Sequence, residues 1–108
     1  MIKIIFNSRK NHISYLEVSG HAQTLNKNES NNLVCAGISS IMYGILNALS
    51  EFEFNKENLK IEKNRIIIYN NKVDKTYDTI LEVALIQLLT VQESYKKFVS
   101  IEEKHEKL

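Results

Sequence analysis

Alternating apolar and polar residues open the chain and predict a β-hairpin. Ile2, Ile4 and Phe6 share one face of an extended segment, because side chains alternate along a strand with a period of two. The segment 13–18 repeats this alternation after a polar, turn-like stretch at 7–12. The sequence therefore predicts two antiparallel strands at 2–6 and 13–18.

Apolar residues at helical spacing then predict a helix from Leu33. Either Asn31 or Asn32 can cap it, because an asparagine oxygen accepts a backbone N–H of the first turn. Its predicted apolar face consists of Val34, Ile38, Ile41, Met42, Ile45 and Leu49. Gly37 and Gly44 each cost such a helix on the order of 1 kcal/mol relative to alanine. We therefore expect a close packing contact at these glycines.

A second helix is predicted to begin at Asp74 or Thr76. Its main apolar face, with steps of three and four, consists of Tyr77, Leu81, Ala84, Leu88, Val91, Tyr95 and Phe98. Val83 and Ile86 extend the apolar surface around the helix. Such a helix is expected to be central or covered by a partner chain, and the charged tail at 102–108 is expected to fray.

Between the helices, the β-branched segments 59–62 and 65–69 flank Lys63-Asn64, a plausible two-residue turn. The element order is β-β-α-β-β-α. With 108 residues, the chain forms one domain spanning 1–108. The expected class is α+β, with an antiparallel or mixed four-stranded sheet packed with two helices.

Composition and charge narrow the classes of function and the cellular compartment that we expect. There are 14 Lys and Arg against 13 Asp and Glu, so the basic excess typical of nucleic-acid binders is absent. One cysteine cannot form an internal disulfide, which favours a reducing compartment. The longest apolar-rich run, at 80–91, is expected to be too short for a membrane span, which needs ~20 residues. We expect a soluble cytoplasmic protein with no membrane association, no metal site and no cofactor.

Cys35 and His21 are the candidate chemical groups. If Asn32 caps the helix, the Cys35 thiol lies in the first turn, where the helix dipole favours the thiolate and backbone N–H groups could stabilise an oxyanion. His21 follows the second predicted strand and could accept the thiol proton, as in thiol acyl transfer. Ser39, one turn later, could line the same pocket or bond its own backbone.

Other interpretations stay open at this point. A lone cysteine is commonly a small buried apolar residue. A non-catalytic binding module is therefore the main alternative. A redox-sensing thiol is less favoured because the chain holds no resolving cysteine. A small basic patch for RNA, formed by Arg9, Lys10, Lys56, Lys60 and Lys63, is weaker still.

Two motifs make the chain recognisable. Gly20-His21-Ala22, a polar loop, and Leu33-Val34-Cys35-Ala36-Gly37-Ile38-Ser39 together resemble the ribosomal-processing cysteine protease Prp family. The resemblance implies an endopeptidase with Cys35 as nucleophile and His21 as base. The implied substrate is the N-terminal extension of the twenty-seventh large-subunit ribosomal protein, and the implied assembly is a homodimer.

The resemblance also indicates which residues contact substrate, namely Gly20, Ala22, Asn32, Ala36 and Ser39. Two departures stand out. The family's acidic residue three positions before the cysteine is Asn32 here, which carries no charge to stabilise an imidazolium. The loop between His21 and Cys35 is also slightly longer than in the family. Residues 23–32 are predicted to act as a flexible lid over an extended peptide.

Overall fold

A computed structural model describes the backbone of residues 1–20 and 29–104, and the side chains of 1–20 and 33–104. The chain opens with the predicted hairpin, formed by β1 (Ile2–Arg9) and β2 (His12–Ser19). Both strands are longer than predicted because the turn is confined to Lys10 and Asn11. These two residues have φ values of 51° and 62°, as a tight hairpin turn of two residues requires.

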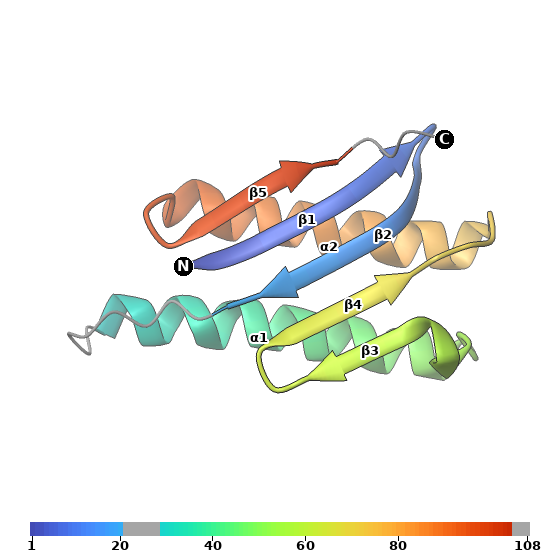
Figure 1. The fold of residues 1–108 in the computed structure, drawn as a ribbon, viewed down its shortest axis with the longest axis horizontal. Helices are drawn as coiled ribbons and strands as arrows, with labels where there is room; N and C mark the ends of the chain where they lie inside the picture. The colour runs from blue at the N-terminus through green and yellow to red at the C-terminus, as the bar shows by residue number, and fades with distance from the viewer. Residues whose placement is uncertain (21–28, 105–108) are drawn as a thin grey trace.

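The sheet has five strands in the order β3-β4-β2-β1-β5 (Figure 1). The hairpin of β3 (Leu59–Glu62) and β4 (Arg65–Tyr69) is confirmed at the predicted bounds. The prediction of four strands is wrong. The fifth strand, β5 (Val99–Glu103), pairs in parallel with β1 at the sheet edge. The first part of the tail that was expected to fray therefore forms a strand.

Helix α1 spans Glu29–Glu51, so it begins earlier than predicted. Residues 29–32 are helical rather than part of a loop, and neither Asn31 nor Asn32 is the cap. A short 3₁₀ turn, η1 (Lys56–Asn58), connects α1 to β3. The predicted apolar face of α1 is confirmed, because all of its members lie in the core or pack against it.

Helix α2 spans Lys75–Ser94 and is capped by Asp74, as predicted. One Asp74 carboxylate oxygen accepts the backbone N–H groups of Thr76 and Tyr77 at 2.9 and 3.2 Å. The helix ends four residues before Phe98, because the backbone of Tyr95 leaves helical geometry, with φ −135° and ψ 48°. This early end leaves residues 99–103 to extend along β1.

Both helices lie behind the sheet in Figure 1 and cover one of its faces. The main core fills the space between the sheet and the two helices. Its most buried members include Ile4, Leu16, Ile68, Met42 and Leu81. The opposite face carries the Tyr15–Tyr69 ring pair and the ion pair between Arg65 and Glu17. Burial and the neighbouring Glu17 carboxylate raise the pKa of Tyr15 to about 12.

The glycines of α1 do not pack as the sequence predicted. Side chains built at Gly37 and Gly44 would project into open space, so the expected close contact is absent within the described residues.

By length and composition alone, Leu33–Glu51 could cross a membrane, although the run at 80–91 could not. In this fold the apolar face of that segment packs against the sheet, and core helices of soluble proteins meet the same criterion.

On α2, three apolar side chains remain exposed, namely Val83, Ile86 and Leu89. The prediction of a homodimer remains a prediction.

Candidate active site

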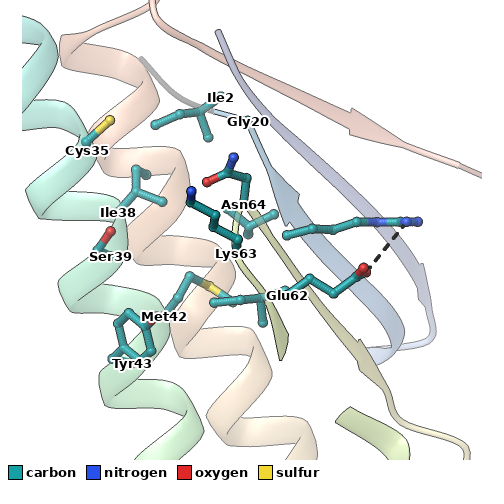
Figure 2. Close-up of a pocket in the computed structure, with 13 residues that line it drawn as sticks. Ile2, Gly20, Cys35, Ile38, Ser39, Met42, Tyr43, Glu62, Lys63 and Asn64 are labelled. Atoms are coloured by element: carbon teal, nitrogen blue, oxygen red, sulfur yellow. Dashed lines mark ion pairs between the residues drawn. The ribbon is translucent and has the colours of Figure 1, made fainter. Parts of the chain in front are cut away.

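A pocket of about 180 Å³ lies between α1 and the end of the sheet where β2 finishes (Figure 2). Its floor is apolar and consists of Ile2, Val18, Ile38, Met42 and Ile66. One wall is the helix row Cys35, Ser39 and Tyr43. The opposite wall is formed by Gly20 and by the turn between β3 and β4, which includes Lys63 and Asn64. We call this the Cys35 pocket.

The α1 wall follows directly from helical geometry. Residues four apart lie on one face of a helix, so Cys35, Ser39 and Tyr43 form a single row along the pocket. Cys35 is half-buried and packs against the core, whereas Ser39 is exposed. In Figure 2 the Cys35 thiol points from α1 toward the side where Ile2 and Gly20 lie. The sulfur is therefore held by packing and faces the pocket.

Gly20 shapes the other wall. Its φ is +88°, a conformation that side chains with a Cβ rarely adopt. A Cβ at this position would also overlap the carbonyl oxygen of Met1. The Gly20 N–H donates to the carbonyl of Asn64 at 3.0 Å. The chain leaving β2 is thus fixed to the neighbouring hairpin turn at the edge of the pocket.

The structure brings three of the predicted site residues together, because Gly20, Cys35 and Ser39 line the same pocket. Ala36 lies exposed on α1 and is not part of the lining. His21 and Ala22 lie outside the described residues. Asn32 belongs to α1, and its side chain lies outside the described part.

The helix start changes the electrostatic argument for Cys35. Because α1 begins at Glu29, Cys35 lies in the second turn. Only the first four N–H groups of a helix lack an internal partner, and the dipole effect decays within the first turn. The predicted roles of the helix start, in forming the thiolate and binding an oxyanion, are therefore not supported by its position. A base near the thiol becomes the more important requirement.

Sequence reasoning missed the polar wall opposite Cys35. The side chains of Lys63 and Asn64 extend from the hairpin turn into the space facing α1 (Figure 2). The turn itself was predicted, but nothing in the sequence indicates that strand order brings it to Cys35. Tyr43 was also missed, although its position eight residues after Cys35 is a signal that helical periodicity provides. Within the described residues, no cluster of three His, Cys, Asp or Glu side chains could hold a metal ion.

Solved structures share this fold. Two structures of an essential ribosomal processing protease Prp from S. aureus match with TM-scores of 0.79 and 0.80, at 20% and 21% identity. The first holds a covalently linked product peptide and the second a substrate peptide. Both matches cover 96% of this chain and 100% of the S. aureus chain. A protein from Streptococcus mutans matches with a TM-score of 0.76 at 20% identity, covering 98% of this chain and 96% of that chain.

No curated protein sequence matches the chain. At about one-fifth identity, the structural matches establish the fold. The sequence itself matches the family model for cysteine protease Prp over residues 1–100. Because that match spans nearly the whole chain, the protein belongs to the cysteine protease Prp family.

Proposed function

We propose that the protein is a cysteine endopeptidase in which Cys35 is the nucleophile and His21 the general base. One observation carries this proposal. The Cys35 side chain faces a pocket that Gly20 also lines, and Gly20 is bonded directly to His21 in the chain. Family membership supplies the reaction class, because the matching family is one of cysteine proteases.

The proposed reaction has two stages, formation of a thioester on Cys35 and its hydrolysis. His21 accepts the thiol proton while the Cys35 sulfur attacks the carbonyl carbon of the scissile bond. The tetrahedral intermediate then expels the amine, which takes the proton from His21 and leaves a thioester on Cys35. A water molecule, deprotonated by His21, then attacks the thioester, and the Cys35 sulfur leaves with that proton as a thiol while the new carboxyl group is released. Since Cys35 lies beyond the first turn of α1, thiolate formation depends on the imidazole.

The proposed substrate is the N-terminal extension of a large-subunit ribosomal protein, the twenty-seventh, in the cytoplasm. The S. aureus relatives are described as ribosomal processing proteases, and one of them holds a substrate peptide. The Cys35 pocket is compatible with a peptide, because it has an apolar floor and polar groups on both walls.

The direct test is cleavage of the N-terminally extended ribosomal protein from the same organism. We expect the purified protein to remove the extension and Cys35→Ala to remove none. Ser40→Ala is the matched control, since Ser40 is exposed on α1 and outside the pocket lining. Cleavage by Cys35→Ala at the wild-type rate would contradict the assignment of the nucleophile.

The base has its own test. His21→Ala should lower kcat/KM by at least ~10²-fold, because general acid–base catalysis contributes on that scale. His105→Ala, in the charged tail, serves as the control and should leave the rate unchanged. An unaltered rate in His21→Ala would remove the histidine from the mechanism.

A second candidate is a non-catalytic module that binds a ribosomal protein. The observation in its favour is that Cys35 packs against the core, as a structural cysteine does. Asn32 also lacks the carboxylate that the resemblance leads one to expect. In the cleavage experiment this candidate predicts a stable complex with the extension intact, even with excess protein and long incubation.

A further inference from the structure

Tyr43 has a large aromatic ring that the fold does not use. Its exposed fraction is 56%, although it lies beside a pocket with an apolar floor. Within the described residues its side chain makes no hydrogen bond or ring contact, in contrast with Tyr15, Tyr69 and Tyr77. Figure 2 shows Tyr43 farther along the helix row from Cys35 than Ser39. The ring is thus available to a bound molecule.

The distance between Cys35 and Tyr43 along α1 indicates which residue of a bound peptide would lie beside Tyr43. Eight residues separate Cys35 from Tyr43, and a helix rises about 1.5 Å per residue, so the two positions are about 12 Å apart along the axis. An extended peptide advances about 3.3 Å per residue. A peptide attacked at Cys35 and lying along this wall would therefore place its third or fourth residue from the scissile bond beside Tyr43.

We propose that Tyr43 forms a remote subsite that selects an apolar side chain three or four residues from the cleaved bond. This inference rests on the proposed function and identifies part of the peptide that the same site prefers. Burying an apolar side chain against the exposed Tyr43 ring removes apolar surface of both groups from water. Ser39, midway along the row, is placed to hydrogen-bond the peptide backbone between the two positions.

The opposite wall is consistent with a peptide of this kind. Lys63 and Asn64 face α1 across the pocket, and their side chains have no hydrogen bond or ion pair among the described residues. They can donate to peptide carbonyls, and the apolar surface they offer is limited to the methylene chain of Lys63. Selection of a side chain by hydrophobic contact therefore falls mainly to Tyr43, because every residue of the floor is 9% exposed or less.

The test pairs protein and peptide changes. A parent peptide spans the cleavage site of the extended ribosomal protein, and single serine replacements are made at apolar positions three and four residues from the bond on each side. With the wild-type protein, one replacement should raise KM about tenfold, as loss of an apolar contact does, with kcat little changed. With Tyr43→Ala, the parent should already show the raised KM, and the same replacement should have little further effect.

Phe52→Ala is the matched control, because Phe52 is an equally exposed aromatic residue outside the pocket lining. It should keep the wild-type KM and the wild-type discrimination between peptides. Tyr43→Ala should keep the wild-type melting temperature, which separates a role in binding from a role in folding. If Tyr43→Ala discriminates between the peptides as strongly as wild type does, the subsite does not exist.

Calorimetry separates this inference from the proposed function. The same peptides are titrated into Cys35→Ala and into the double variant Cys35→Ala/Tyr43→Ala. Binding that weakens about tenfold on loss of Tyr43 supports the subsite even if the wild-type protein cleaves nothing. Binding that is unchanged, or absent in both variants, overturns it even if cleavage by the wild-type protein is efficient.

Discussion

The two ends of the sheet differ in how fully their polar side chains are paired with one another. At the end near the turn of β1 and β2, His12, Asn70 and Asp78 form a closed cluster. The His12 Nδ1 atom lies 2.7 Å from an Asp78 carboxylate oxygen, and the Asn70 amide donates to that same oxygen at 3.1 Å. Asn70 is only 1% exposed and also donates to the Ile13 carbonyl at 3.1 Å.

At the other end, Glu62 and Arg65 line the Cys35 pocket as an ion pair at 3.9 Å, whereas Ser39, Lys63 and Asn64 line it as exposed polar side chains. Ser39, Lys63 and Asn64 make no side-chain hydrogen bond within the described part of the chain. Polar groups that satisfy one another hold a fold together, whereas polar groups around an open pocket can bind a ligand. The comparison therefore assigns the polar side chains of the first end to stability and the exposed polar side chains of the second end to ligand binding.

The largest expected effect comes from Gly20→Ala, at the Cys35 pocket. The left-handed conformation costs a residue with a Cβ roughly 1–2 kcal/mol, and overlap with the Met1 carbonyl adds to this. We expect the free energy of unfolding in urea to fall by about 3 kcal/mol or more. The neighbouring Ser19→Ala is the control and should change it little. A Gly20→Ala protein as stable as wild type would show that the tight approach of Met1 is not a constraint.

A smaller loss is expected from Asn70→Ala in the closed cluster. It leaves the Ile13 carbonyl without its side-chain donor and Asp78 with one partner fewer, which costs about 1–3 kcal/mol. Because the cluster lies at the far end from Cys35, kcat/KM per folded molecule should not change. A loss of activity at full stability would contradict the division between the two ends.

The smallest effect is a gain from Gly37→Ala or Gly44→Ala. A methyl group at either position meets open space, and alanine is favoured over glycine in a helix by about 0.5–1 kcal/mol. Each substitution should therefore raise the melting temperature slightly. A melting temperature that falls, by an amount that depends on protein concentration, would instead indicate that a partner chain packs closely on this side of α1.

Much of the fold was predictable because its signals are local. The alternation in β1 and β2, the apolar face of α1, the Lys63-Asn64 turn and the Asp74 cap all depend on residues close together in the sequence. The fifth strand was missed because Val99 and Ile101 continue the apolar spacing of α2. Only pairing with β1, about a hundred residues away in the chain, makes them a strand.

The residues of the candidate site also fall into a group that the sequence indicated and a group that it did not. Gly20, Cys35 and Ser39 were found because they lie in recognisable motifs, and they line one pocket. Lys63 and Asn64 could not be assigned to that pocket, since their place depends on β4 pairing with β2. The role of His12 in the closed cluster could not be predicted either. Its partner Asp78 lies 66 positions along the chain, beyond any local pattern.

The central claim is that an imidazole, rather than the start of α1, makes the Cys35 thiol reactive. Its most direct test is the rate at which iodoacetamide alkylates Cys35, the single cysteine, at about pH 6. The wild-type protein should react at least tenfold faster than His21→Ala. Equal rates in the two proteins, with both correctly folded, would contradict the claim.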